Sequence, residues 1–183
     1  MRLELKYLFV VFLLFMQTAW WGVDAQYDKD VFFMRGRHAL SEGKYARAIE
    51  NFNVLSQLDT SDYWTFFFRG IAKYNLGDLR GAKRDFDRSV RINPVFTNGY
   101  HYRGITQSRF GNYDAALADL EEAIKLRPGY DGLYFSRGVT YFLSQQFDKA
   151  VADFDRYIRK EPKDPTAYLN RGASWLFLGD TLK

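Results

Sequence analysis

The sequence predicts an all-α protein built as a stack of helical hairpins, and three features carry this prediction. The dipeptide Arg-Gly recurs at a constant period, with its arginines at positions 35, 69, 103, 137 and 171 of the 183-residue chain. Apolar residues between these dipeptides follow helical spacing. Glycine and proline recur where the helical stretches end. A fixed period of this length is typical of proteins in which each repeat is one supersecondary unit.

Each repeat is predicted to contain a first helix, a tight turn and a second helix. In one repeat, Ser61 to Asn75 carries apolar residues at helical spacing. Gly77 follows, in a position where the left-handed backbone conformation costs glycine little. A second amphipathic stretch runs from about Leu79 to Ile92 and stops before Pro94. The chain therefore folds back on itself once per repeat.

The start of the last helix has its own local signal. Asp164 is a residue type that caps helices, and Pro165 suits a first helical position. A helix is therefore expected to begin at Pro165.

A glycine in the middle of each first helix needs a physical reason, because glycine there costs about 1 kcal/mol relative to alanine. Small residues recur in the second helices with the same period as these glycines. We expect Gly70 to face Ala82 across its hairpin, and Gly104 to face Ala116. The two helices of each hairpin would then approach closely.

Acidic residues recur in pairs along the second helices, as Asp85 and Asp87, Asp119 and Glu121, and Asp153 and Asp155. Residues two apart on a helix point to nearly opposite sides, so the two carboxylates of a pair cannot bind the same metal ion. The first acid of each pair lies at a constant separation from an arginine of the first helix, at Arg69, Arg103 and Arg137. We therefore expect one interior Arg–Asp pair per hairpin, which would fix register more than it adds stability.

The pattern resembles the tetratricopeptide-repeat (TPR) family. The family's signature of large, small, aromatic, small, aromatic and proline residues appears at Tyr134, Gly138, Tyr141, Ala150, Phe154 and Pro162. The resemblance implies a right-handed α-solenoid. It implies four complete repeats, 29–62, 63–96, 97–130 and 131–164, and a partial fifth repeat or C-terminal helix over 165–183. The first repeat departs from the pattern, because Thr60 stands in place of the closing proline.

In this family the first helices line a concave groove that binds peptides, which implies a set of ligand-facing residues here. The proposed peptide-binding residues are Phe33, Arg37, Trp64, Phe67, Phe68, Ile71, Asn98, His101, Tyr102 and Phe135. The same correspondence turns Ile105, Ser136 and Val139 toward the groove. The alternative is that several of the rings belong to the core between helices.

The first 25 residues have the layout of a secretory signal peptide. Positively charged residues precede an apolar run over 8–16, and Val23 and Ala25 are the small residues of a cleavage site. We expect the mature chain to begin at Gln26 and to be exported to the periplasm or the extracellular space. The alternatives are an uncleaved anchor at residues 7–23 and a buried N-terminal helix; a membrane-spanning helix needs about 20 apolar residues.

Composition narrows the function classes. The chain has no cysteine, which excludes disulfides and thiol chemistry. Its net charge of +4 comes from lysine and arginine interleaved with acids, so no nucleic-acid partner is expected. His38 and His101 are isolated from each other, and no nucleophile, phosphate-binding or zinc-protease motif occurs. We therefore expect no catalytic site, no metal site and no cofactor.

The resemblance implies a non-catalytic scaffold that binds a peptide or a partner protein in the concave groove. Two alternatives stay open. The last helix is strongly apolar from Trp175 to Leu178, which favours assembly or self-association through the C-terminal helix. The chain stops just after a turn-like pair, Gly179 and Asp180, which favours an N-terminal piece of a larger TPR protein with a downstream domain.

Overall fold

A computed structural model describes residues 29–179, so the predicted signal peptide at residues 1–25 lies outside the described part. The described residues form nine helices, namely residues 29–41 and α2 to α9, and contain no strand. The chain divides into two compact units, residues 1–60 (unit 1) and 61–183 (unit 2), which are taken separately below. Across residues 29–179, each helix is too short or too polar to cross a membrane.

Unit 1 contains one helical hairpin. Its helix of residues 29–41 and α2 (Tyr45–Leu58) are joined by a turn at Gly43, where φ is +72°. A Cβ added to Gly36 would lie 2.8 Å from the ring of Phe52, which is fully buried. The missing side chain of this glycine therefore makes room for a ring from the second helix.

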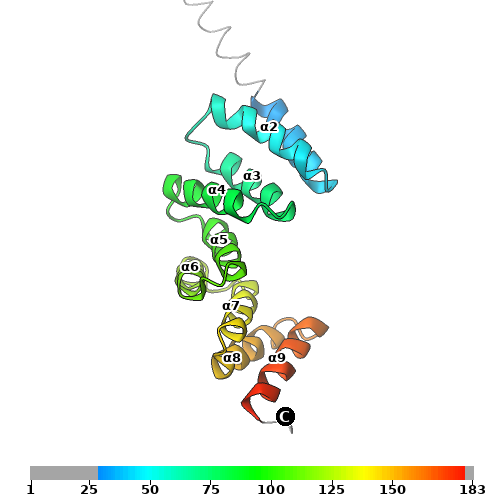
Figure 1. Ribbon diagram of the computed structural model, residues 1–183, viewed down its shortest axis with the longest axis vertical. Helices are drawn as coiled ribbons and strands as arrows, with labels where there is room; N and C mark the ends of the chain where they lie inside the picture. The colour runs from blue at the N-terminus through cyan, green and yellow to red at the C-terminus, as the bar shows by residue number, and fades with distance from the viewer. Residues whose placement is uncertain (1–28, 180–183) are drawn as a thin grey trace, which may run out of the picture. The chain divides into compact units, whose positions relative to one another are not determined.

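Unit 2 contains three hairpins and a last helix (Figure 1). Its elements are α3 (Tyr63–Asn75), α4 (Leu79–Ile92), α5 (Thr97–Arg109), α6 (Tyr113–Leu126), α7 (Gly132–Leu143), α8 (Phe147–Ile158) and α9 (Pro165–Leu178). Each helix packs against its neighbours in the chain. Within the described residues, the first helices α3, α5, α7 and α9 also contact one another in order, whereas α4, α6 and α8 do not. The first helices therefore form the inner layer of this stack.

Helix ends follow the local sequence. The Asp164 carboxylate accepts a hydrogen bond from the backbone N–H of Thr166 at 2.9 Å, and Pro165 is the first residue of α9, as predicted. Gly77 has the expected left-handed conformation, with φ of +84°. Gln145 adopts the same conformation in the corresponding turn, with φ of +62°, at a cost of about 1 kcal/mol for a residue with a side chain.

The recurring glycines do permit close helix contacts, but one predicted partner is wrong. A Cβ added to Gly70 would lie 2.6 Å from the ring of Phe86, and its nearest neighbours are all atoms of that ring rather than of Ala82. Helical side chains lean toward the helix N-terminus, so the Phe86 ring covers the turn that contains Ala82. The ring, and not the small residue, occupies the space that the glycine leaves.

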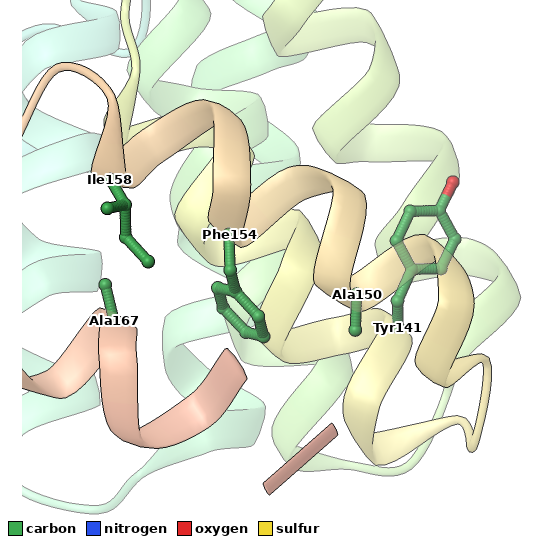
Figure 2. Close-up of a cluster of buried hydrophobic side chains, with 5 residues drawn as sticks. All are labelled: Tyr141, Ala150, Phe154, Ile158 and Ala167. Atoms are coloured by element: carbon green, nitrogen blue, oxygen red, sulfur yellow. The ribbon is translucent and has the colours of Figure 1, made fainter. Parts of the chain in front are cut away.

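The core of unit 2 includes two buried clusters, each built from three successive elements. One joins α7, α8 and α9 and contains Tyr141, Ala150, Phe154, Ile158 and Ala167 (Figure 2). The other joins α3, α4 and the start of α5 and contains Phe67, Ala82, Phe86 and Phe96. Each cluster draws on three successive helices, so burial couples each hairpin to the next helix in the chain.

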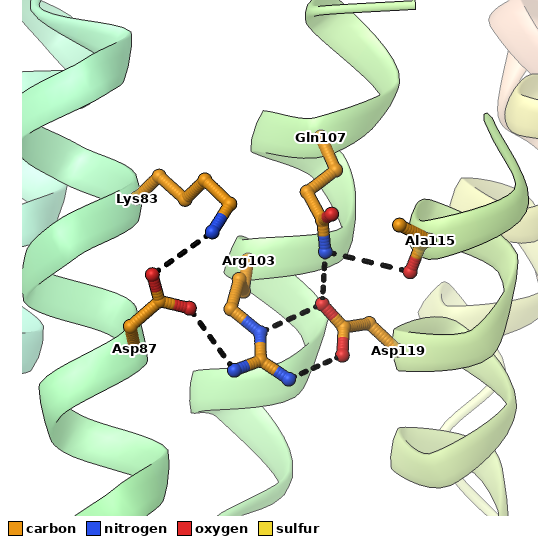
Figure 3. A network of polar contacts seen from close by, with 6 residues as sticks. All are labelled: Lys83, Asp87, Arg103, Gln107, Ala115 and Asp119. Carbon is orange, nitrogen blue, oxygen red and sulfur yellow. Dashed lines mark hydrogen bonds and ion pairs between the residues drawn. The ribbon is translucent and has the colours of Figure 1, made fainter. Parts of the chain in front are cut away.

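The predicted Arg–Asp pairs are confirmed in all three hairpins of unit 2. Arg103 Nε donates to one Asp119 oxygen at 2.8 Å and Nη2 donates to the other at 2.6 Å (Figure 3). These hydrogen bonds raise the pKa of Arg103. The same two-bond geometry joins Arg69 to Asp85 and Arg137 to Asp153.

In two of the three pairs, the second acid contacts the arginine of the next repeat. Asp87 Oδ1 accepts a hydrogen bond from Arg103 Nη1 at 3.1 Å, so one guanidinium joins α4 to α6 through α5 (Figure 3). Asp155 accepts from Arg171 Nη1 at 2.7 Å in the same way. The two acids point apart, as expected, and the carboxylates serve two different arginines.

Candidate functional site

The inner layer of unit 2 contains a hollow of about 280 Å³. It lies among three first helices, α3, α5 and α7. The lining residues are Tyr74, Ile105, Ser108, Arg109, Phe135, Ser136, Val139, Thr140 and Leu143. Because three successive repeats contribute, the hollow exists only when the repeats are stacked.

Apolar side chains form most of the lining of the hollow, and the cationic side chain of Arg109 lies beside them. Leu143, at the end of α7, is 44% exposed. Ile105 and Val139 are half-buried, one on each of two adjacent helices. The exposed Arg109 has its guanidinium carbon 5.1 Å from the centre of the Tyr74 ring. The hollow therefore offers an apolar surface with a positive charge at its edge.

The serine and threonine hydroxyl groups of the lining form hydrogen bonds within and between α5 and α7. Thr140 Oγ1 donates to the backbone oxygen of Ser136 at 2.9 Å and lies 3.3 Å from Ser108 Oγ. Ser136 Oγ donates to the backbone oxygen of Gly132 at 3.1 Å. These bonds satisfy the hydroxyls inside the layer and position the two helices, so the hollow is lined chiefly by carbon.

His101 is part of this helix contact. Its Nε2 lies 2.8 Å from Ser136 Oγ, and its ring meets the edge of Tyr130 at 6.0 Å between ring centres. The side chain is only 8% exposed, and burial lowers its pKa to about 4. His101 is therefore neutral at pH 7 and acts as a hydrogen-bonding residue between α5 and α7.

Acidification is expected to destabilise the wild-type protein more than a His101→Gln variant. The folded pKa is about 4, below the ordinary value of 6.5, so the unfolded chain binds more protons in this window. The stability that depends on neutral His101 is complete above about pH 6.5 and is lost as the pH falls toward 4. Between pH 7 and pH 5 the excess loss should be about 2 kcal/mol. Urea unfolding followed by circular dichroism at both pH values measures it.

The other histidine provides a matched control. The His38 side chain is 75% exposed and lies 3.5 Å from Glu42. A His38→Gln variant makes the same substitution at an exposed histidine and controls for the replacement itself. Equal pH dependence in His101→Gln and wild type would show that burial does not control this titration.

Two of the predicted peptide-binding residues, Phe67 and His101, are buried. Phe67 is 5% exposed, and its ring packs against Phe96 at 4.9 Å and Phe86 at 5.9 Å between centres. The exposure expected of Phe67 as a ligand-facing residue is therefore not found. The same holds for the buried His101. Both side chains stabilise contacts between helices because the next first helix covers them.

The rings beside Phe67 are half-buried. Trp64 and Phe68 stack at 5.4 Å with planes 18° apart, and Trp64 also meets Phe96 at 4.9 Å. Tyr102 contacts Phe67 at 5.5 Å. One side of each of these rings covers the α3–α5 core. This agrees with the alternative that several rings belong to the core between helices. Their role in peptide binding stays a prediction.

The other predicted residues lie in several places. Phe33 and Arg37 belong to unit 1, where the Arg37 guanidinium carbon lies 6.0 Å from the Phe33 ring centre. Ile71 packs beside the α3–α5 core, and Asn98 is half-buried in α5. Phe135 lines the hollow of unit 2.

Only some of the residues that line the hollow were predicted from the sequence. Ile105, Ser136 and Val139 line it together with Phe135, as the family correspondence implied. The residues Tyr74, Ser108, Arg109, Thr140 and Leu143 were missed. Most of them lie toward the C-terminal ends of the first helices, so extending the groove correspondence by one helical turn would have included several.

Comparisons with known proteins identify a matching repeat profile and solved structures of similar fold. The sequence profile described as tetratricopeptide repeat matches residues 103–165 and 140–181. No curated protein sequence gives a significant match.

Solved structures of MamA are similar in fold. A crystal structure of MamA aligns with a TM-score of 0.76 and 20% identity, covering 84% of both chains. MamA from residue 41 to its end, from Desulfovibrio magneticus RS-1, gives 0.78 and 19%, covering 84% of this chain and 87% of that one. A further MamA crystal structure gives 0.68 and 25%, covering 74% and 79%. The predicted all-α stack of TPR hairpins is thereby confirmed.

Proposed function

We propose that this chain is a tetratricopeptide-repeat protein and a non-catalytic scaffold that binds a peptide of a partner protein along the first helices of unit 2. TPR domains mediate protein–protein interactions, and the match to the TPR profile supports this class of function. The observation that carries the proposal is the hollow among α3, α5 and α7, with its apolar wall and its edge cation. Apolar pockets with a few well-placed polar groups are typical binding sites.

The chemistry of the hollow defines the peptide. An aliphatic or aromatic side chain would occupy the space among Ile105, Val139 and Leu143. A carboxylate of the peptide, from its own side chain or its C-terminus, would pair with the guanidinium of Arg109. Arginine stays charged at every physiological pH, so the charge preference would not depend on pH.

Replacement of Leu143 by glutamate is expected to weaken peptide binding at least about tenfold, because an anchor residue of an interface contributes on the order of 2 kcal/mol. The added carboxylate places a charge on the apolar wall and competes for Arg109. Linear peptides selected from a displayed library on the wild-type chain supply the probe, and fluorescence anisotropy measures their affinity. Circular dichroism should show unchanged helicity, since Leu143 is 44% exposed.

Val95→Glu is the matched control, because Val95 is also an exposed aliphatic residue of unit 2, at 70%, and lies outside the hollow. It should bind the selected peptides as wild type does. Equal affinity in Leu143→Glu and Val95→Glu would place the binding surface elsewhere and contradict the proposal.

We further propose that the chain is exported. The charged start, the apolar run over 8–16 and the small residues Val23 and Ala25 support this localisation. N-terminal sequencing of the protein recovered from an exported fraction should begin at Gln26. Recovery of intact Met1 from the membrane fraction would favour the anchor at residues 7–23 instead.

A further inference from the structure

The outer face of α4 carries three arginine side chains. Arg80, Arg84 and Arg91 are all exposed, and we call them the arginine ridge. They share one side of the helix, because residues four and seven apart lie on the same face. The opposite side of α4 packs into the hairpin through Ala82 and Phe86, which are fully buried. The ridge therefore points away from the core of its own hairpin.

Within the part of the chain that the structure describes, no carboxylate binds a member of the arginine ridge. The acid on the same side of α4 is Asp87, and two other cations bind it. Lys83 Nζ lies 2.9 Å from one Asp87 oxygen, and Arg103 Nη1 lies 3.1 Å from the other (Figure 3). Because Asp87 is already paired twice, it does not neutralise the ridge.

The outer face of the next second helix, α6, is acidic. Asp114 stands one repeat after Arg80, and it is exposed. Glu121 is exposed on the same side of α6. Lys125 is the cation of this face, and its Nζ lies 3.2 Å from a Glu122 oxygen. A basic outer face on α4 is thus followed by an outer face on α6 in which acids outnumber cations.

The basic and acidic faces lie close together. The Arg103 guanidinium bonds to Asp87 of α4 at 3.1 Å and to Asp119 of α6 at 2.6 Å, so one side chain spans the space between the two helices (Figure 3). A flat anionic membrane or a nucleic-acid duplex would extend over both helices and meet the acids of α6. A single acidic helix is only about 10 Å across and can lie along α4 alone. The charge pattern therefore favours a narrow acidic polypeptide.

We propose that the arginine ridge of α4 binds an acidic helix of a partner polypeptide, in the outer layer and apart from the hollow. The ridge extends about 16 Å from Arg80 to Arg91, at about 1.5 Å per residue. Carboxylates four and seven residues apart on the partner helix would each meet one guanidinium. An arginine can form two parallel hydrogen bonds to a carboxylate, which suits it to this recognition. Because the pairs would be exposed, salt would weaken them.

A labelled alanine-based helical peptide with glutamates at the spacing of the arginine ridge tests the proposal. At low ionic strength it should bind the full chain saturably in a fluorescence anisotropy titration, and added salt should weaken binding. The same peptide with glutamines should bind at least about tenfold more weakly, because three exposed ion pairs together account for about that factor. The proposal is overturned if the glutamate peptide shows no saturable binding at about 1 mM.

A triple variant shows whether the ridge is the site. Replacing all three ridge arginines by glutamine should weaken binding of the glutamate peptide about tenfold and leave helicity unchanged, since the side chains are exposed. A matched control removes the same charge from three exposed cations outside α4, through Arg159→Gln, Lys160→Gln and Lys163→Gln. The control should bind nearly as wild type does. Equal losses in the two triple variants would assign binding to net charge and overturn the proposal.

Other anionic partners are tested with the same variants. Vesicles of phosphatidylserine and phosphatidylcholine, and a short DNA duplex, should bind the ridge variant as weakly as they bind wild type. A larger loss of vesicle or duplex binding than of peptide binding in the ridge variant would assign the ridge to that partner and reject the acidic helix. Sedimentation that shows self-association, abolished in the ridge variant, would assign the ridge to the acidic α6 face of a second copy.

Discussion

Replacement of Arg103 by methionine is expected to lower the free energy of unfolding by about 3 to 5 kcal/mol, the usual loss when one member of a buried ion pair is removed. The Asp119 side chain is 8% exposed, and its carboxylate would lose both hydrogen bonds from the guanidinium. Gln107 Nε2 would remain its donor from a side chain, which does not neutralise the charge. Asp87 would lose its contact with the next repeat as well. Urea unfolding followed by circular dichroism measures the change.

Two further variants show whether burial is the cause. Arg171→Met breaks a pair whose side chains are 29% and 37% exposed, and should cost less than about 1 kcal/mol. Asp119→Leu added to Arg103→Met should recover much of the loss, because the uncompensated carboxylate is removed. Equal losses for Arg103→Met and Arg171→Met would contradict the assignment of a buried pair.

Gly104→Leu is expected to lower the free energy of unfolding by about 3 kcal/mol, at the upper end for an overpacked helix contact. A Cβ at this position would lie 3.0 Å from Leu120 Cγ and 3.1 Å from the backbone oxygen of Ala116. The backbone oxygen cannot move without moving α6, so the two helices must separate. Thermal melting should show a decrease of about 5 to 10 °C.

Gly172→Leu is the matched control for this effect. It makes the same substitution at the equivalent position of α9, where an added Cβ meets no described atom within 4 Å. Leucine also has the higher helix propensity, so the variant should be as stable as wild type or slightly more stable. A melting temperature of Gly104→Leu within about 2 °C of the control would contradict the close-contact argument.

The first repeat lacks the two carboxylates that bind arginines in unit 2. The positions that correspond to Asp85 and Asp87 are occupied by Asn51 and Asn53. An amide forms hydrogen bonds but no ion pair, and the Asn51 side chain donates to the backbone oxygen of Arg47 at 2.7 Å. The charge-assisted links that join successive repeats of unit 2 therefore depend on carboxylates that the first repeat lacks.

Features that repeat locally could be predicted from the amino-acid sequence. The period of Arg-Gly, the turn at Gly77 and the start of α9 at Pro165 all follow from residues close together in the chain, because helix periodicity, left-handed glycines and caps are local. The pairing of Arg103 with Asp119 also followed, because an antiparallel hairpin fixes which residues of its two helices are opposite.

Features that depend on the packing of one repeat against the next became visible in the three-dimensional structure. The burial of Phe67 and His101, the second bond of Arg103 to Asp87 and the hollow beside Leu143 all arise where a first helix meets a neighbouring repeat. The angle between repeats, the lean of each ring and the depth at which a side chain lies are set by many weak contacts at once. A periodic pattern in one chain specifies which residues are equivalent, and the packing specifies which of them remain exposed.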